Sequence, residues 1–223
     1  MLVAGGTGYI GRRLVAALMA RGHRVRVLTR DGSEHRVPSG AQVAPGNPLD
    51  PASYAAQVRR EDTIVHLVGT PHPSPAKAAE FRRVDLPSIQ AAVAAASTRA
   101  AAHLVYVSVA HPAPVMKVYI EVRSAGERAI ADAGLTATVV RPWYVLGPGH
   151  RWPLLLIPMY WIARRLPSLR DGAERLGLVT IDQMVGTLVA AVEHPPAPGS
   201  IRIVDVPGIR KGRDTLSGVP SGA

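Results

Sequence analysis

Hydrophobic positions along this chain fall into two alternating patterns. Short apolar runs predict buried strands at 2–4, 24–29, 42–44, 63–68, 104–107 and 136–140. Between these runs, apolar residues recur every three or four positions, which predicts helices near 9–21, 77–102 and 119–133. Gly22 is expected to end the first helix, and Pro51 to open a shorter one.

Strands that alternate with helices predict a parallel sheet, because each right-handed crossover returns the chain to the same end of the sheet. We therefore expect an α/β fold of the Rossmann type, with a doubly wound parallel sheet covered by helices on both faces. In such sheets a ligand binds outside the carboxyl ends of the strands, where the strand order reverses. The motifs described below lie at such strand ends, so they are expected to meet at that edge.

The pattern changes after Pro142. Residues 152–163 are almost wholly apolar, but this stretch is shorter than the roughly 20 residues that a membrane-spanning helix needs. Beyond it we expect a strand at 176–181 and a helix at 183–193, with Asp182 as the residue that caps its first turn.

A last strand is predicted at 201–206, and the residues after it are rich in Gly, Ser, Arg and Lys. The predicted organisation is therefore a single domain over residues 1–207, followed by a tail at 208–223 that is expected to be disordered. Within the domain, about 142–200 would form a small C-terminal substrate lobe.

Composition narrows the function. The chain has 223 residues, 47% of them hydrophobic, and no cysteine, which excludes disulfides, a thiolate nucleophile and cysteine metal ligands. The net charge of +10 comes from arginines scattered singly or in pairs, so we expect no nucleic-acid partner. Met1 lies too close to the glycine turn for a secretion signal, and a cytoplasmic location is expected.

Three glycines at spacings of three, Gly5, Gly8 and Gly11, lie between the first strand and the first helix. This arrangement is typical of a dinucleotide-binding turn, because it allows a tight bend and a close approach of the backbone to the pyrophosphate. The amino end of the following helix would supply N–H donors to the phosphates.

The end of the second strand predicts which nicotinamide cofactor is bound. A carboxylate there would bond the ribose 2′-hydroxyl of NAD, whereas this chain has Thr29 and Arg30. A guanidinium suits the 2′-phosphate of NADP. Asp31 follows directly, so NAD remains an alternative, as does an Arg30 that is simply an exposed loop residue.

An ordered set of motifs resembles the short-chain dehydrogenase/reductase superfamily in its extended and atypical branches. They are the glycine turn Ala4–Gly11, the segment Gly46–Asp50, the fourth-strand motif Val65–Gly69 and the sixth-strand motif Arg141–Gly149. Among subgroups the chain is most similar to NmrA-like proteins and to accessory subunits of complex I.

The resemblance implies which residues contact the cofactor. In the family, the turn contributes its central residues, the position of Asn47 faces adenine, the fourth-strand motif lines the cofactor and the sixth-strand motif lies near the nicotinamide. On this chain the implied contacts are Thr7, Tyr9, Ile10, Asn47, Leu67, Val68, Gly69, Pro142, Tyr144 and Val145, beside the three glycines and Arg30.

The resemblance also implies a catalytic set. In the family a tyrosine acts at the substrate oxygen, a lysine four residues later supports it and holds the ribose, and a serine or threonine positions the substrate. Here Tyr119 is followed by Arg123 in place of the lysine; Ser108 aligns with the cofactor-side serine, and Val109 with the catalytic hydroxyl. Arg123 would still favour tyrosinate and bond the ribose.

Two functions follow as hypotheses. The first is an NADP(H)-dependent oxidoreductase of a small or apolar carbonyl compound. The second is a non-catalytic NADP(H)-binding protein, such as a redox sensor or an assembly subunit, since two of the three catalytic positions depart from the pattern. Residues 152–165 would form core, a subunit contact or a peripheral membrane contact. His66, His103 and His111 match no metal-ligand spacing, so no metal is expected.

Overall fold

A computed structural model describes residues 1–148 and 176–211, and its centre is a seven-stranded sheet in which all neighbouring strands are parallel. The strand order is β3-β2-β1-β4-β5-β6-β9. The bounds are β1 Leu2–Ala4, β2 Arg26–Thr29, β3 Gln42–Pro45, β4 Thr63–His66, β5 His103–Val107, β6 Ala137–Val140 and β9 Ile201–Val204. The predicted Rossmann-type α/β fold is therefore confirmed.

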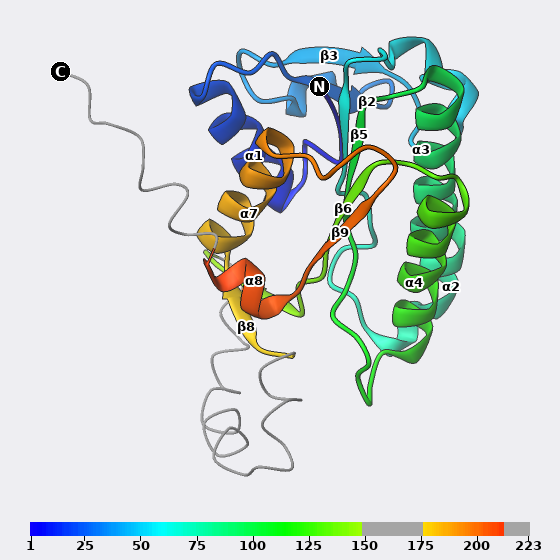
Figure 1. The fold of residues 1–223 in the computed structure, drawn as a ribbon, viewed down its shortest axis with the longest axis vertical. Coiled ribbons are helices and arrows are strands. Elements are labelled where there is room, and N and C mark those ends of the chain that lie inside the picture. Colours follow the sequence, from blue (N-terminus) through cyan, green and yellow to red (C-terminus); the bar gives the residue numbers. More distant parts are fainter. Residues whose placement is uncertain (149–175, 212–223) are drawn as a thin grey trace, which may run out of the picture.

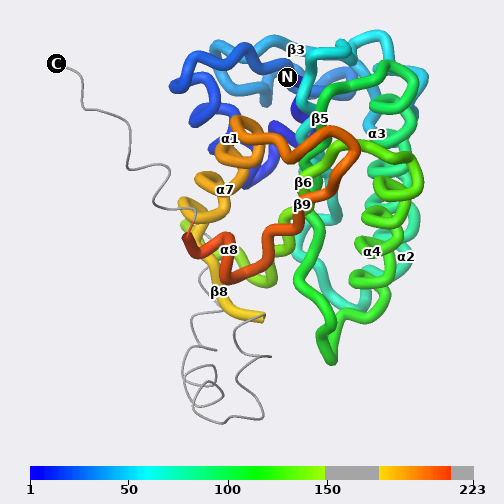
Figure 2. The backbone as a smooth tube through the Cα atoms, viewed as in Figure 1, coloured from blue at the N-terminus to red at the C-terminus, as the bar shows by residue number. Residues whose placement is uncertain are grey.

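Helices cover both faces of the sheet (Figures 1 and 2). Helices α1 (Tyr9–Ala20) and α7 (Ile181–Glu193) pack together on one face, and α3 (Leu86–Arg99) and α4 (Lys117–Asp132) pack together on the other. The order reverses between β1 and β4, because the chain first builds outward through β2 and β3 and then returns to β4. The ligand site of a doubly wound sheet is expected at this point.

The strands carry side chains into two apolar cores, one on each face. Alternate strand residues point to opposite faces, and here both sets are apolar because both faces are covered. One core holds the valines Val3, Val27, Val65, Val105 and Val140 with α1 and α7. The other holds Leu2, Leu28, Ile64, Leu104 and Val139 with α3. This explains why the strands appear in the sequence as apolar runs rather than as alternating patterns.

The alanine-rich stretch is helical, as predicted, but not uniform. It begins with a short turn at Pro75–Lys77 and α2 (Ala78–Glu80), continues as a π-helical turn at Phe81–Asp85, and runs on as α3. The prediction of a helix opening at Pro51 is only partly right, since the structure has two short 3-10 turns, Pro51–Ser53 and Ala55–Gln57.

The start of α7 corrects the predicted cap. Thr180, not Asp182, is the capping residue: its hydroxyl accepts from the Gln183 N–H at 3.2 Å, and Gln183 Oε1 accepts from the Thr180 N–H at 2.9 Å. This reciprocal pair satisfies two backbone donors at once, so the helix begins two residues earlier than Asp182 predicts.

The C-terminal part adds two small elements. Strands β7 (Tyr144–Leu146) and β8 (Leu178–Thr180) form a separate two-stranded parallel sheet. Helix α8 (Val206–Lys211) includes the first residues of the tail predicted to be disordered. It is ordered because Val206 and Ile209 are buried in the same apolar core as α7.

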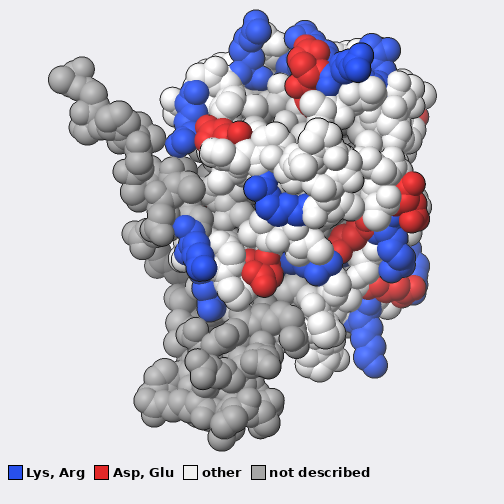
Figure 3. Space-filling model, in the orientation of Figure 1, with Lys and Arg blue, Asp and Glu red and all other residues white. Residues whose placement is uncertain are grey.

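The apolar stretch 152–165, and with it much of the predicted substrate lobe at 142–200, lies outside the described residues. Within the described ranges, none of the helices combines the length and the apolar character that crossing a membrane requires. On the face shown in Figure 3, the Lys and Arg side chains form separate groups, with Asp and Glu groups between them.

Candidate functional site

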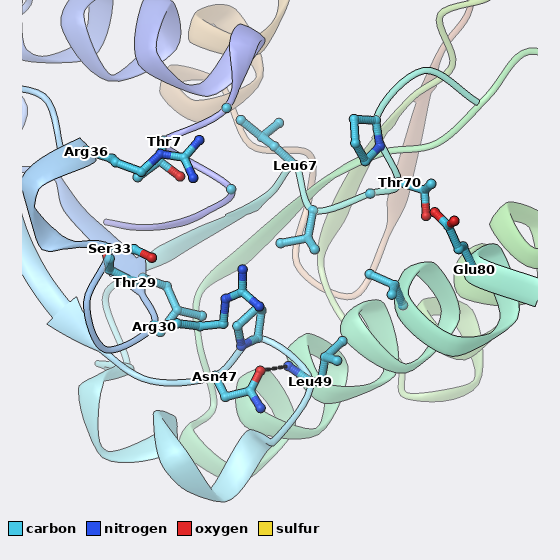
Figure 4. A pocket seen from close by; sticks show the side chains of 18 residues that line it. Thr7, Thr29, Arg30, Ser33, Arg36, Asn47, Leu49, Leu67, Thr70 and Glu80 are labelled. Atoms are coloured by element: carbon cyan, nitrogen blue, oxygen red, sulfur yellow. Dashed lines mark hydrogen bonds between the residues drawn. The ribbon is translucent and has the colours of Figure 1, made fainter. Parts of the chain in front are cut away.

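A cavity of about 430 Å³ lies at the carboxyl ends of β1, β2 and β4, where the strand order reverses (Figure 4). This volume is within the range of small-molecule sites, roughly 300–1,000 Å³. Eight of the residues predicted to bind the cofactor line it: Gly5, Thr7, Gly8, Arg30, Asn47, Leu67, Val68 and Gly69.

The glycine turn forms one wall of this cavity. The Gly8 N–H donates to the Gly5 carbonyl at 3.1 Å, which closes the turn directly before α1. A Cβ at Gly11 would overlap the carbonyl oxygen of Gly5, so the third glycine allows the helix to pack on the turn itself. No side chain caps the amino end of α1. Its free N–H groups and helix dipole therefore suit the phosphates of a dinucleotide.

Polar side chains gather where β2 ends. Arg30, Ser33 and Arg36 all line the cavity, and Arg30 and Arg36 are exposed to solvent. Asp31 lines an adjoining cavity, to which Arg30 and Asn47 also contribute. Ser33 and Arg36 were not identified as site residues from the sequence. The feature that could have indicated them is a second arginine six residues after Arg30, which the 3-10 turn Glu34–Arg36 brings to the same wall.

Asn47 occupies the wall across from the glycine turn. Its Oδ1 accepts from the Leu49 N–H at 3.1 Å, which fixes the orientation of the amide. The amide nitrogen is thereby turned away from that contact, so it can donate to a ring nitrogen of a base placed in the cavity. The prediction that Asn47 meets adenine is compatible with this orientation.

Five other residues predicted to contact the cofactor lie outside the described wall of this cavity. Tyr9 and Ile10 are half-buried on α1, where they pack against the core. Pro142 is buried beyond the end of β6, and Tyr144 and Val145 lie on the short strand β7. Their contact with a cofactor stays a prediction.

Arg123 is the centre of a buried network beside the cavity. Its Nη2 donates to Asp85 Oδ1 at 2.7 Å, and its Nη1 donates to the Val107 carbonyl at 3.0 Å. Asp85 accepts in addition from the N–H of Thr70 at 3.0 Å and from its hydroxyl at 2.6 Å. Since a Cβ at Gly69 would overlap the guanidinium, this glycine makes room for Arg123 at the cavity wall.

The buried position of Arg123 changes its expected role. Its side chain is only 6% exposed, and Asp85 is completely buried. The guanidinium lies 5.1 Å from the centre of the Tyr119 ring, over its face. Arg123 therefore joins the ends of β4 and β5 to α4, and both of its Nη atoms donate to protein groups. Its contact with a ribose stays a prediction.

Ser108 belongs to a second network. Its hydroxyl donates to Glu127 Oε1 at 2.5 Å, and the same carboxylate is paired with Arg141. Glu127 follows Arg123 by four residues on α4, so the two networks share one helix face. Val109, at the position where the family has its catalytic hydroxyl, is buried.

Tyr119 is half-buried at the first turn of α4, and its ring packs against Phe81 at 4.8 Å between ring centres. Together, Tyr119, Arg123 and Ser108 lie along one side of α4 near the end of β5. Asp85, Thr70 and Glu127 were missed in the sequence, because their partners are between 15 and 38 residues away.

Comparison with known proteins is consistent with this geometry. The family of NAD(P)H-binding proteins matches residues 5–149. Ceramide reductase of Caulobacter vibrioides is 29% identical over 207 residues, which cover 92% of this chain and 64% of that protein. In a Streptomyces species, 3-diazoavenalumate denitrifying reductase is 30% identical over 236 residues, covering 92% of this chain and 75% of that protein.

A solved structure shows the same fold. A short-chain dehydrogenase/reductase superfamily protein from Agrobacterium tumefaciens, with bound NAD, has a TM-score of 0.65 at 18% identity and covers 98% of this chain and 83% of its own. The family match shows an NAD(P)H-binding protein, and the shared fold is the one that the resemblance to short-chain dehydrogenases/reductases implies. The family also establishes a nicotinamide cofactor, NAD or NADP.

Proposed function

The chain belongs to the family of NAD(P)H-binding proteins, and we propose that it is an NADP(H)-dependent reductase of a small or apolar carbonyl compound. The observation that carries this proposal is the position of Tyr119 on α4, beside a buried cation that is in contact with the wall of the dinucleotide cavity. Its similarity to proteins named as reductases supports the same reaction class.

The arginines at the end of β2 favour NADP(H) over NAD(H). Arg30, Ser33 and Arg36 together offer two guanidinium groups and a hydroxyl to a 2′-phosphate, and charge-assisted pairs of this kind are strong. Asp31, the carboxylate that would favour NAD(H), is not among the residues that line the dinucleotide cavity, although it lines an adjoining one together with Arg30. The glycine turn and the amino end of α1 would hold the pyrophosphate, and Asn47 the adenine.

The reaction needs a hydride, a proton and a positioned carbonyl group. NADPH held by the glycine turn, the arginines at the end of β2 and Asn47 would supply the hydride to the carbonyl carbon. The Tyr119 hydroxyl donates its proton to the carbonyl oxygen, so that an alcohol forms, and the tyrosinate regains a proton from water. The positive charge of Arg123 stabilises the tyrosinate during this step.

Arg123 acts in this proposal as a positioning residue. Its guanidinium is held by Asp85 and the Val107 carbonyl, so its charge is fixed beside Tyr119. Ser108 would orient α4 through Glu127 rather than touch the substrate, since its hydroxyl is already donated to that carboxylate.

A second candidate is a non-catalytic NADP(H)-binding protein, such as a redox sensor. It is favoured by Val109, which offers no hydroxyl, and by the engagement of Arg123 with buried partners. In this alternative the cofactor cavity has the same role, but bound NADPH is not oxidised by a carbonyl compound.

Two measurements test the proposal. The first is the Kd of NADPH and NADH for the protein and for Arg36→Ala, with Arg60→Ala as the control because Arg60 is an exposed arginine away from the cavity wall. We expect Arg36→Ala to weaken NADPH at least tenfold and to leave NADH unchanged. Equal weakening of both nucleotides would contradict the NADP(H) preference.

The second measurement is NADPH oxidation by a panel of ketones and aldehydes. Tyr119→Phe is expected to lower kcat about 100-fold or more, as loss of a general acid does, with an unchanged Kd for NADPH. Tyr54→Phe, a buried tyrosine elsewhere in the fold, is the control. Unchanged turnover in Tyr119→Phe would overturn its role, and tight NADPH binding without turnover on any carbonyl would favour the redox sensor.

A further inference from the structure

A second cavity of about 340 Å³ has Tyr119 among its lining residues. Its walls come from Pro75, from Phe81, and from Pro114, Val115 and Met116 in the loop that precedes α4. In Figure 1 this loop projects beyond the sheet, on the same side as β8. Among its described lining residues, Lys117 is the one with a charge.

One helical segment contributes residues to the walls of both cavities. Glu80 and Val84 line the dinucleotide cavity, whereas Phe81 lines the second one. Asp85, which holds Arg123, ends the same segment, and the turn from Phe81 to Asp85 is π-helical. Turns of this kind are frequent at functional sites, because the extra residue redirects the neighbouring side chains.

The loop at the mouth of the second cavity displays apolar surface. Val115 is 52% exposed, the largest exposed fraction among the described large hydrophobic residues. Met116 has a φ of 59°, in the left-handed region that a residue with a long side chain rarely adopts. Such a conformation persists where the surroundings require it, and exposed apolar surface beside a cavity is typical of a binding site.

We propose that this cavity binds the apolar chain of the carbonyl substrate, with the carbonyl group at Tyr119 and the chain running outward past Val115. The inference rests on the proposed reductase function and deepens it, because it assigns the substrate class: a ketone or aldehyde that carries an alkyl chain or a single apolar ring. The walls offer few hydrogen-bond partners, so a polyhydroxylated substrate such as a sugar would lose its hydration without compensation.

The size of the cavity limits the substrate. A volume of about 340 Å³ is at the lower end of ligand sites. The free energy gained per buried methylene corresponds to a factor of about three to four in affinity. Affinity should therefore rise with chain length until the cavity is full and then level off.

The test uses straight-chain methyl ketones from 2-butanone to 2-undecanone. Their Kd is measured by calorimetry on the protein with bound NADP⁺, and their kcat/KM by NADPH oxidation. Val115→Asp places a carboxylate at the cavity mouth, and Val43→Asp is the matched control, because Val43 is another exposed valine, on the edge strand β3. Val115→Trp, which fills the mouth with apolar surface, is the second variant should Val115→Asp fold poorly.

We expect tighter binding with each added methylene until the cavity is full, and a ratio of 2-undecanone to 2-butanone affinity that falls at least tenfold in Val115→Asp but not in Val43→Asp. Chain-dependent binding that Val115→Asp removes, without any turnover, would support the cavity and reject the reductase. Turnover without dependence on chain length, or an equal loss in both variants, would overturn the cavity assignment and leave the reductase intact. Absence of both binding and turnover would reject both.

Discussion

Arg123 Nη2 donates a hydrogen bond to Asp85 Oδ1 at 2.7 Å, and this ion pair is buried between α4 and the π-helical turn. It joins the helix that carries Tyr119 to the segment that lines both cavities. Because both charges are removed from water, the pair depends on its full set of hydrogen bonds. Thr70 and the carbonyls of Val107 and Val68 provide further ones.

Removing one partner of this pair is expected to destabilise the protein strongly. Asp85→Leu leaves the guanidinium buried without its counter-charge, and the N–H and hydroxyl of Thr70 lose their acceptor. A loss of about 3–5 kcal/mol in the free energy of unfolding is therefore expected. Arg123→Met should cost less than Asp85→Leu, since Asp85 keeps both hydrogen bonds from Thr70. Urea unfolding of both variants measures the difference.

The double variant Asp85→Leu/Arg123→Met should lose less free energy of unfolding than the sum of the two single variants, which is the signature of direct coupling. Arg82→Met is the control: Arg82 and Glu121 form an exposed ion pair at 3.7 Å, for which less than about 1 kcal/mol is expected. Additive losses in the double variant would contradict the coupling.

Gly11→Ala should impair nucleotide binding and stability together. The added Cβ overlaps the Gly5 carbonyl, which is fixed backbone within the turn, so the turn must move. We expect a loss of NADPH affinity of at least tenfold and a lower Tm. Gly134→Ala is the control: the added methyl meets no neighbour there, although φ is +62°. It should lower the Tm and leave the Kd unchanged.

Two buried histidines should make the protein less stable at acidic pH. Burial first, and the charge of Arg123 second, lower the pKa of His66 to about 3, and burial with the charge of Arg202 lowers the pKa of His103 to about 4. In the unfolded chain both titrate near 6.5. As the pH falls below 6.5, the unfolded chain takes up protons at both histidines while the folded protein does not. The free energy of unfolding therefore decreases as the pH falls toward 4, by about 2 kcal/mol for each histidine at pH 5.

Urea unfolding at pH 7.5, 6 and 5 checks this dependence. His103→Gln, which can still bond Thr138, should lose about half as much stability between pH 7.5 and 5 as the unchanged protein does. His35→Gln, at an exposed histidine, should leave the slope as it is. A slope that is unaffected by His103→Gln would show that other groups dominate.

The capping box of α7 gives a prediction about stability alone. Thr180→Ala should lower the free energy of unfolding by about 1 kcal/mol, because the Gln183 N–H loses the hydroxyl that accepts from it. Asp182→Ala should cost less, since Asp182 contributes only its charge near the helix dipole. Thermal unfolding measures both variants. A larger loss of stability in Asp182→Ala than in Thr180→Ala would contradict Thr180 as the capping residue.

The sequence by itself determined the order of strands and helices and the parallel sheet, because apolar runs and helical spacing are local patterns. It also determined the glycine turn, since the requirement for Gly11 acts between residues six positions apart. Arg30 and Asn47 were predictable for the same reason: each lies within two residues of the end of a strand.

Only the tertiary structure decided what the catalytic positions contact. Whether Arg123 meets a ribose or a buried carboxylate depends on Asp85, which is 38 residues earlier and reaches it through a π-helical turn that no spacing predicts. Arg36 and the apolar cavity at Val115 likewise depend on loops whose course is set by packing. Local patterns specify elements, whereas the partners of a buried charge are specified by how those elements meet.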